Sequence, residues 1–451
     1  MKRSNGLHFY INVENINQIV LDEETHTGAV NHSIHALDTF FSTIESYGKE
    51  KYPNSFNVEK ITGGRLHFFV VDKVCSAFEV VKDVSSYAFQ VSRIINKEIP
   101  KYRTIDDFKI QIGAAYGRFY MFEFTAKDGF SEETSIGYAA NFAAKLQALA
   151  SVSSLTISKD IYEGIMEDDK KLFHKVSDRS LSKYGQDHYY ASHLSFLPLE
   201  FTNTELTDEI KAYSNRINLS DIKYGSLRKP LNFRDLNVEQ CKKLNGIPVF
   251  ADVRGFTSQF NEDDSNLAEM AERTQCILTS MYTTTTNNGG VHIQFQGDRE
   301  LSLYHDLPAR QENGITIPAT LCYKTAVLAA MRLIDAVKPF AAHIGVGEDY
   351  GRLFATKIGA RNEKDNLLLG ETVIMADMME DKHAGEDQLA ITREVYNGLL
   401  REDRNLAKLF KENGGYYIAT IGFADYVKAR ESAQLTRNTE NKKYNGAWRD
   451  L

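Results

Sequence analysis

Two aspartates in the second half of the chain occupy positions where carboxylates can bind metal ions. Asp252 ends the apolar run PVFADV and is followed by RGFT, whereas Asp298 lies in the predicted hairpin turn QFQGDRE. Carboxylates on adjacent strand ends can share divalent cations, and Mg²⁺ and Mn²⁺ favour such oxygen ligands. A lone aspartate in a hairpin is usually only a turn former. The pairing of Asp298 with the Asp252 motif therefore predicts a site for Mg²⁺ or Mn²⁺ with a triphosphate.

The residues after Asp252 predict a place for phosphate oxygens. Gly255, Phe256 and Thr257 lead towards a predicted helix. Their backbone N–H groups would meet the positive end of the helix dipole, where anions are stabilised. We expect these three residues to contact the substrate.

The chain contains an internal repeat. The run ISKDIYEGI, which begins at Ile157, recurs as ITREVYNGL at Ile391, and Tyr116-Gly117-Arg118 recurs at the same offset as Tyr350-Gly351-Arg352. A period this long indicates a duplicated domain rather than a solenoid repeat. The length of 451 residues suits two such domains with polar segments around them.

Both copies predict the same order of elements, β, α, β-β, α, β, α, β. An apolar strand comes first, from Leu7 or Ile247, and a hairpin follows around Gly63-Gly64 or Gly297-Asp298. The intervening helix of the first copy has an apolar face at three- and four-residue spacings. This order predicts an α+β fold with helices packed on a largely antiparallel sheet.

We place the domains at 1–196 and 246–426. The polar segment 197–245 is interpreted as a linker with one short helix, and 427–451 as a charged C-terminal tail containing Trp448.

Composition excludes several classes of function. A net charge of -8 and a pI near 5.9 argue against a nucleic-acid-binding surface. No apolar run approaches the roughly 20 residues of a membrane span, and the N-terminus does not resemble a secretory signal. Four scattered cysteines show no paired spacing and predict reduced thiols. We expect a cytoplasmic protein that binds neither membrane nor nucleic acid.

The run FADVRGFT, followed by QGD, resembles the metal-binding half of class III nucleotide cyclases. The resemblance covers both repeats and implies two tandem cyclase domains, each with a ferredoxin-like βαββαβ core and additional α/β elements. In that family, the active site forms between two partners. One partner holds two metal ions, which implies Asp252, Val253 and Asp298 as ligands here. The other contacts the base and supplies an Asn and an Arg to the transition state.

The two copies have lost complementary parts of that site. Where the second copy has Asp252 and Asp298, the first has Asn12 and Gly64. The first copy is therefore not expected to hold metals.

The helix motif is retained only by the first copy. YAANFAAKLQ gives Asn141 and Lys145, whereas the second copy has Ile374 and Met378 there. Lys145 replaces the family's arginine, so it keeps the positive charge without the bidentate geometry. Lys183 is a candidate for the family's triphosphate-binding lysine. The resemblance thus implies an intramolecular pseudo-dimer with one complete site, and higher oligomers are compatible with it.

The resemblance assigns base recognition to Lys60 and Thr134. This pair lacks the glutamate of the guanine type, so it suits adenine or a pyrimidine carbonyl.

A stand-alone cyclase with divergent motifs is similar to the pyrimidine cyclases of Pycsar-type antiphage systems, which make cyclic CMP or cyclic UMP for a separate effector. Bulk from Phe56, Arg65 or His67 would narrow the base pocket, although sheet packing is the commoner role of aromatic residues. Two alternatives remain: a bacterial adenylyl cyclase, and a degenerate cyclase-like module that only binds nucleotide.

Overall fold

The computed structural model describes residues 2–71, 77–198, 201–216, 218–219, 222–227, 229–236, 240–256, 267–312, 315–359 and 365–431. The chain forms two compact units. Unit 1 comprises Met1–Leu244, Gly255–Ala271 and Arg352–Glu371. Unit 2 comprises Asn245–Arg254, Glu272–Gly351 and Thr372–Leu451.

Unit 1 is built on a sheet with the strand order β2-β3-β1-β4-β6-β8-β7, and β5 pairs with β4 at its side. Neighbouring strands are antiparallel except for the parallel pair β4–β6. The strands are β1 (Lys2–Val13), β2 (Phe56–Thr62), β3 (Arg65–Val71), β4 (Ile110–Thr125), β5 (Ser131–Ile136), β6 (Ser154–Ile157), β7 (His174–Ser177) and β8 (His188–His193).

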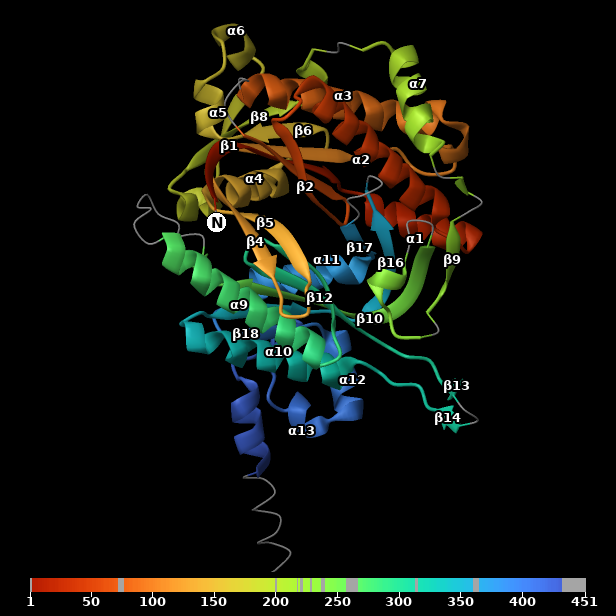
Figure 1. Ribbon diagram of the computed structural model, residues 1–451, viewed down its shortest axis with the longest axis vertical. Helices are drawn as coiled ribbons and strands as arrows, with labels where there is room; N and C mark the ends of the chain where they lie inside the picture. The colour runs from red at the N-terminus through yellow and green to blue at the C-terminus, as the bar shows by residue number, and fades with distance from the viewer. Residues whose placement is uncertain are drawn as a thin grey trace, which may run out of the picture. The chain divides into compact units, whose positions relative to one another are not determined.

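Helices cover both faces of this sheet. Helices α2 (Asn31–Lys51) and α3 (Ala77–Glu98) pack on one face, and α4 (Tyr138–Leu149) packs on the other (Figure 1). Successive side chains of a strand point to opposite faces, so Ala114 joins the α2–α3 core and Ala115 joins the α4 core. Helix α4 approaches β4 closely at Gly113, where a Cβ would lie 2.1 Å from the backbone nitrogen of Gln147. Shorter helices are α1 (Ile16–Thr27), α5 (Lys159–Glu163) and α6 (Glu167–Lys170).

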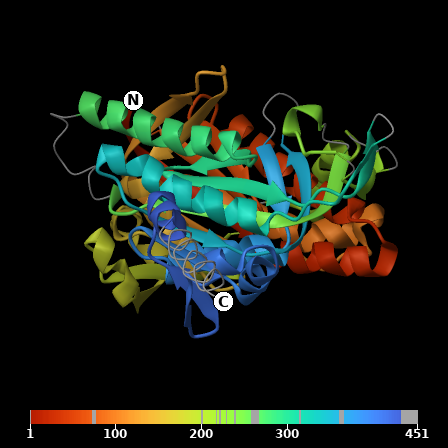
Figure 2. The same ribbon diagram turned by 90° about the horizontal axis from the view of Figure 1, so that it is seen from below.

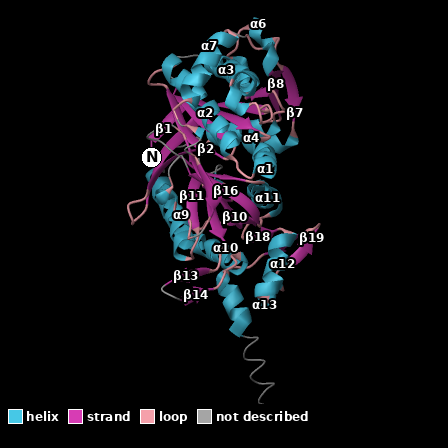
Figure 3. Ribbon diagram, turned by 90° about the vertical axis from the view of Figure 1, so that its right-hand side faces the viewer, coloured by secondary structure: helices cyan, strands magenta, loops and turns pink. Residues whose placement is uncertain are grey.

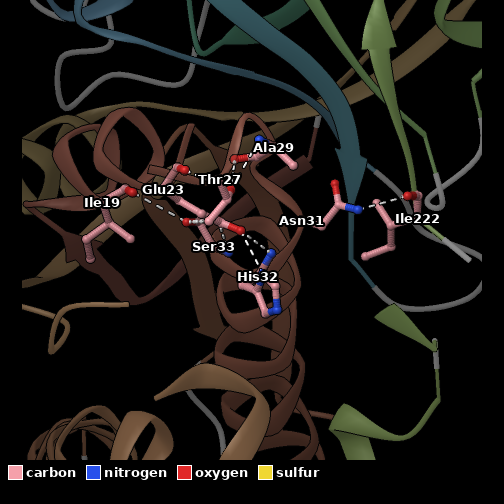
Figure 4. Close-up of polar contacts among 8 residues, drawn as sticks. All are labelled: Ile19, Glu23, Thr27, Ala29, Asn31, His32, Ser33 and Ile222. Carbon is pink, nitrogen blue, oxygen red and sulfur yellow. Dashed lines mark hydrogen bonds and ion pairs between the residues drawn. The ribbon is translucent and has the colours of Figure 1, made fainter. Parts of the chain in front are cut away.

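The buried carboxylate of Glu23 holds the N-terminus of α2 (Figure 4). It accepts hydrogen bonds from the backbone nitrogens of His32, at 2.9 Å, and Ser33, at 2.7 Å. The His32 ring and the Ser33 hydroxyl also contact it. The carboxylate thus satisfies two of the amides that a helix start leaves without partners, and it complements the helix dipole.

The described part of the segment 197–245, which was predicted to be a linker with one short helix, contains a helix and a strand. It forms α7 (Asn203–Ser214), which begins with a capping box between Thr202 and Glu205, and β9 (Lys223–Ser226). Leu206 and Ile210 of α7 are buried in the core of unit 1. These two apolar residues are enough to anchor the helix because α7 packs on α2 and α3.

Unit 1 also contains a hairpin from the second repeat, formed by β16 (Gly351–Ile358) and β17 (Asp365–Leu369), which we call the arm hairpin. Phe354, Ile358, Leu367 and Leu369 of the arm hairpin are buried in the core of unit 1. The Asp365 carboxylate accepts a 2.7 Å hydrogen bond from the backbone nitrogen of Ile61 on β2.

Unit 2 has a sheet with the order β11-β12-β10-β15-β18-β20-β19. Helices α9 and α10 lie on the same side of it (Figures 1 and 2). Strands β13 and β14 form a separate hairpin (Figure 3). The strands are β10 (Gln240–Val253, within unit 2 from Asn245), β11 (Val291–Gln296), β12 (Arg299–His305), β13 (Arg310–Glu312), β14 (Ile315–Ile317), β15 (Ile344–Glu348), β18 (Gln388–Ile391), β19 (Lys411–Asn413) and β20 (Tyr416–Ala419). The helices are α9 (Leu267–Asn287), α10 (Tyr323–Val337), α11 (Glu371–Met378), the π-helical turn η8 (Met379–His383), α12 (Arg393–Glu402) and α13 (Arg404–Ala407).

The two sheets repeat each other in detail. Gly113 on β4 approaches α4 as Gly347 on β15 approaches η8, where a Cβ would lie 2.2 Å from the Glu380 nitrogen. The repeated sequence motif begins at the last residue of β6 and includes α5 in the first copy, and it begins at the last residue of β18 and continues into α12 in the second. The predicted α+β architecture with two similar domains is confirmed.

The described cysteines Cys241, Cys276 and Cys322 are free thiols, as predicted, and Cys75 lies outside the described residues. Among the described helices, none has the length and apolar character needed to cross a bilayer. Most of the predicted tail, residues 432–451 with Trp448, also lies outside the described residues.

Candidate active site

Strand pairing brings Asp252 and Asp298 to one end of the sheet of unit 2. Asp252 on β10 lies opposite Arg299, the first residue of β12, and opposite Gly345 on β15. Asp298 immediately precedes Arg299 in the turn, which Gly297 makes possible with a φ of 70°. The structure therefore brings these two predicted metal ligands together.

The carboxylates around this point repel one another. Burial, and next the neighbouring Asp252, raise the pKa of Asp298 well above its usual value. Glu380 on η8 joins them: burial, and to a smaller extent the neighbouring Asp252, raise its pKa to about 7 against the opposing effect of Arg299. Such shifts mean that negative charge is disfavoured here, so an added cation would be stabilised.

Two arginines already lie among these carboxylates. Arg254 forms ion pairs with Asp252, at 3.0 Å, and with Glu380, at 2.7 Å. Arg299 pairs with Glu380 at 2.8 Å and with Asp377. Three carboxylates thus pair with two guanidinium groups within the described part of unit 2.

Gly345 makes room for one of these arginines. A Cβ at this position would lie 1.8 Å from Nη2 of Arg254, so the glycine admits the guanidinium. Arg254 also donates to the carbonyls of Glu380, at 2.9 Å, and Ala384, at 2.7 Å.

The donor set fits a hard divalent cation. Asp252 and Asp298 offer carboxylate oxygens, and Val253 offers a backbone carbonyl beside them, which is the chemistry that Mg²⁺ and Mn²⁺ prefer. The raised pKa of the buried Asp298 is what a carboxyl poised beside a second carboxyl should show. These residues could hold the metal ions that the sequence predicts.

The first repeat has neutral groups at the equivalent positions. Asn12 lies opposite Arg65 and Gln111, as Asp252 lies opposite Arg299 and Gly345. Its amide donates to Gln111 at 3.1 Å, and Gln147 donates to the same oxygen at 3.3 Å. These amide side chains form hydrogen bonds with one another and have no negative charge to attract a cation.

Gly64 takes the place of Asp298 in the first repeat. A Cβ there would lie 2.6 Å from Cγ2 of Ile16 and 2.7 Å from the carbonyl oxygen of Val13. The backbone around this turn is therefore closed to a side chain without rearrangement.

Asn141 and Lys145 lie one turn apart on α4, both half-buried. Their helix follows Gly137, which has a φ of 127°, as α11 follows Gly370, which has a φ of 141°. Lys145 also lies near Asp178, whose pKa is lowered chiefly by hydrogen bonds from Ser180 and also by this lysine. Ile374 on α11, which is the residue equivalent to Asn141 in the second repeat, is exposed.

Lys60 and Thr134 are both buried in unit 1, and each is engaged by a carboxylate. Lys60 forms an ion pair with Glu132 on β5. The Thr134 hydroxyl lies 3.4 Å from Glu59, which also accepts from the Ser135 nitrogen at 2.8 Å. A β-bulge between Val58 and Lys60 leaves Glu59 as the extra residue of β2.

The sequence did not single out Glu59, Arg254, Arg299 or Glu380. Glu59 reaches Thr134 only because of the bulge, and Glu380 reaches Asp252 only through the close approach at Gly347. Arg299 directly follows Asp298, and Arg254 lies two residues after Asp252, so closeness in sequence was the available signal.

The remaining predicted residues have varied positions. Gly255 has a φ of 69°, and Phe256 is buried. Thr257 and the side chain of Lys183 lie outside the described residues. Phe56 packs against Phe68 in the core, which is the sheet-packing role that is commoner for aromatic residues.

Comparison with solved structures identifies the fold. A class III adenylyl cyclase-like ATP-binding protein from Pseudomonas aeruginosa matches 95% of this chain and 90% of its own, with a TM-score of 0.68 and 15% identity. The fold is that of class III nucleotide cyclases. This confirms the α+β prediction of tandem cyclase-like domains.

Two cyclase structures match smaller parts of the chain. The adenylyl cyclase CyaB from P. aeruginosa matches 40% of this chain and 93% of its own, with a TM-score of 0.32 and 18% identity. The guanylate cyclase domain of RhGC from Catenaria anguillulae matches 39% and 95%, with a TM-score of 0.31 and 16% identity. No family model and no curated protein matches the sequence.

Proposed function

We propose that this protein is a nucleotide cyclase that converts a nucleoside triphosphate into a 3′,5′-cyclic monophosphate and pyrophosphate. The observation that carries the proposal is the contrast at equivalent strand positions. The second repeat has Asp252 and the buried Asp298, whose pKa is raised, where the first has Asn12 and Gly64. Only the first repeat has the Asn141–Lys145 helix motif. These complementary losses support one active site with contributions from both repeats, an intramolecular pseudo-dimer.

In this proposal the reaction needs no covalent intermediate. The ribose 3′-oxygen forms a bond to the α-phosphorus, its proton leaves to solvent, and the bond to pyrophosphate breaks. Two Mg²⁺ or Mn²⁺ ions, when bound by Asp252, Val253 and Asp298, supply charge neutralisation for the triphosphate.

The protein itself orients the reactants and stabilises charge. Asn141 holds the ribose, and Lys145 stabilises the charge that develops at the α-phosphate. Gly255, Phe256 and Thr257 contact phosphate oxygens, and Lys183 is a further triphosphate ligand.

We propose a pyrimidine nucleotide as the substrate, contacted by Lys60 and Thr134. A cyclic CMP or cyclic UMP product would act in the cytoplasm on a separate effector in antiphage defence. This part rests on the resemblance of the sequence, and an adenylyl cyclase is the alternative within the same class. Glu132 and Glu59, which engage the two base-contacting residues, would have to share them with the base.

An assay of the purified chain with each of the four nucleoside triphosphates and Mn²⁺ tests the proposal. We expect a cyclic pyrimidine nucleotide as the main product. Cyclic AMP as the dominant product would overturn the pyrimidine assignment, and no product from any substrate would overturn the cyclase assignment.

Variants test which residues form the site. Asp252→Asn and Asn141→Ala should each reduce kcat by at least about 100-fold, since each removes charge or positioning at the reacting phosphate. Asn12→Ala, at the position equivalent to Asp252, is the matched control and should retain activity. An equimolar mixture of the Asp252→Asn and Asn141→Ala proteins should stay inactive, whereas restored activity would show that repeats of different chains pair.

A second candidate function is nucleotide binding without catalysis. The observation that favours it is the pair Arg254 and Arg299, whose guanidinium groups already neutralise carboxylates where cations would bind. The solved structure that matches most of the chain is described as ATP-binding. Tight nucleotide binding without Mn²⁺, unaffected by Asp252→Asn and with no turnover, would favour this candidate over the cyclase.

A further inference from the structure

Three side chains from adjacent strands of unit 1 form a cluster of metal-ligating type. His8 on β1, His67 on β3 and Glu59 on β2 each offer one ligand atom, and these atoms lie within 4.8 Å of one another. None of the three belongs to the proposed catalytic set. All three side chains are shielded from solvent, with the side chains of His67 and Glu59 only 5% and 4% exposed.

The β-bulge of β2 builds this cluster. Lys60 pairs with His67, and the extra residue Glu59 precedes it, so the Glu59 carboxylate lies 3.3 Å from Nδ1 of His67. The equivalent bulge in unit 2, between His292 and Gln294, has Ile293 as its extra residue, and Leu301 takes the place of His67. The ligating side chains are therefore a property of the first repeat alone.

The two imidazoles face each other through their nitrogens. His8 Nδ1 lies 2.9 Å from His67 Nε2. Burial lowers the pKa of His8 to about 3 and the pKa of His67 well below its usual value, so both rings are neutral. Two nitrogen lone pairs at this spacing need either a shared proton or a cation between them.

A hydrogen-bond chain leaves part of this cluster unexplained. The chain would run from Glu59 through His67 to His8 and end there, because Nε2 of His8 is buried without a hydrogen-bond partner in the described structure.

We propose that His8, His67 and Glu59 form a binding site for a borderline transition metal of the Zn²⁺ type. Two neutral imidazoles with one carboxylate are a ligand set that suits Zn²⁺, whose nitrogen ligands lie about 2.0–2.1 Å away. Mg²⁺ prefers oxygen ligands, so this site and the Asp252–Asp298 pair should select different metals.

The charges around the cluster are of both signs. Lys60 and Arg65 contribute, after burial, to the lowered pKa of His67, whereas Glu59 is a carboxylate of the cluster and Lys60 pairs with Glu132. Tyr10 stacks on His67, with ring centroids 4.0 Å apart, and Phe119 packs edge-on against His8, at 4.3 Å, so both rings are held in place. Rigid, buried ligands lose little entropy when they bind a metal.

The test measures metal binding to the tag-free full chain after removal of metals with a chelator. We expect one tightly bound Zn²⁺ per chain by equilibrium dialysis, and a Co²⁺ complex with a ligand-field spectrum typical of nitrogen ligands. A large excess of Mg²⁺ should not displace the Zn²⁺. Displacement by Mg²⁺, or no tight binding at all, would overturn the proposal without any variant.

Variants then locate the site. The double change His8→Gln with His67→Gln should abolish tight Zn²⁺ binding, and Glu59→Gln should weaken it by about 10- to 100-fold. His343→Gln, at a histidine that pairs with Asp387 on the surface of unit 2, is the matched control and should bind as the wild type does. The double variant Asp252→Asn with Asp298→Asn should also keep its Zn²⁺. Unchanged binding in the His8–His67 variant, or loss in the Asp252–Asp298 variant, would place the metal elsewhere.

None of these measurements depends on cyclase activity. A protein that binds Zn²⁺ at this cluster but makes no cyclic nucleotide would uphold this proposal and overturn the proposed function. A protein that makes cyclic nucleotide but does not bind Zn²⁺ at this cluster would uphold the proposed function and overturn this proposal.

Discussion

Buried carboxyl groups set the electrostatics of unit 2 at the level of single residues. Asp298 and Glu380 have raised pKa values beside Asp252, where an added cation would relieve the repulsion. Glu348 on β15 differs from them. It is fully buried, burial raises its pKa to about 8, and neither carboxyl oxygen has a hydrogen-bond partner within the described structure. Ala114 holds the equivalent strand position in the first repeat, so the fold does not require an acid there.

Glu348 should make the stability of the protein depend on pH. The folded state keeps the proton up to about pH 8, whereas the unfolded chain loses it near the ordinary value of 4.5. The free energy of unfolding should therefore fall as pH rises between these values, by about 1.4 kcal/mol per pH unit. Glu348→Gln should remove this contribution to the pH dependence and make the slope shallower than in the wild type, measured by urea unfolding at pH 5 and pH 8.

The control for this prediction is Glu386→Gln, which changes an exposed carboxyl of the same unit. It should leave the pH dependence as in the wild type. An equal slope in the Glu348→Gln protein would mean that Glu348 is ionised in the folded state.

At the level of elements, polar contacts to single carboxylates fix how helices and strands join. Glu23 holds the start of α2. Glu24, the next residue of α1, accepts from Arg352 of the arm hairpin at 3.0 Å and from Tyr224 of β9 at 3.2 Å. Lys243 of β10 also pairs with Glu24, and these cations hold its pKa low despite burial. Adjacent carboxylates on one helix thus anchor three segments distant in sequence.

Removal of the Glu23 carboxylate should destabilise unit 1. Glu23→Ala would leave the buried amides of His32 and Ser33 without acceptors, at a cost of about 1–3 kcal/mol per unsatisfied group. Glu23→Gln keeps one acceptor oxygen and should cost less. Urea unfolding followed by circular dichroism measures both. Exposed Glu79→Ala on α3 is the control, and a Glu23→Ala protein as stable as this control would contradict the assigned role.

At the level of the whole molecule, the repeats are not independent folding units. The arm hairpin comes from the second repeat, yet its apolar side chains complete the core of unit 1. Backbone contacts add to this, because Asp38 accepts from the Gly359 nitrogen at 2.9 Å and Asn17 from the Gly370 nitrogen at 2.6 Å. The division of the chain into two sequence repeats therefore differs from its division into two compact units.

A fragment of residues 1–245 should be poorly stable by itself. Without the arm hairpin, the partners of Phe354, Ile358, Leu367 and Leu369 are exposed to water, at about 25 cal/mol for each Å² of apolar surface. Coexpression with residues 246–451 should restore solubility. Solubility and thermal unfolding of the fragment, alone and coexpressed, test this expectation. If the 1–245 fragment were monomeric and unfolded at the same temperature as the full chain, the arm hairpin would contribute little to the stability of unit 1.

Much of this arrangement could be predicted from the sequence because it depends on local patterns. Strand alternation and hairpin turns fix register, so the contrast of Asp252 and Asp298 with Asn12 and Gly64 was already visible in the aligned repeats. The strand pairings place these residues at equivalent points. The α+β fold followed from the same patterns.

Only the tertiary structure decided which distant groups meet. The bulge that turns Glu59 towards His67, the close approach that brings Glu380 to Arg254, and the burial of the arm hairpin in unit 1 all depend on long-range packing. Such contacts leave no periodic signal, because a side chain's neighbours across a sheet are set by strand order rather than by its own sequence neighbours. The sequence by itself determined where the two aspartates proposed to bind metal are kept and where they are lost. Folding determined which other charges surround them, and it created the His8–His67–Glu59 cluster.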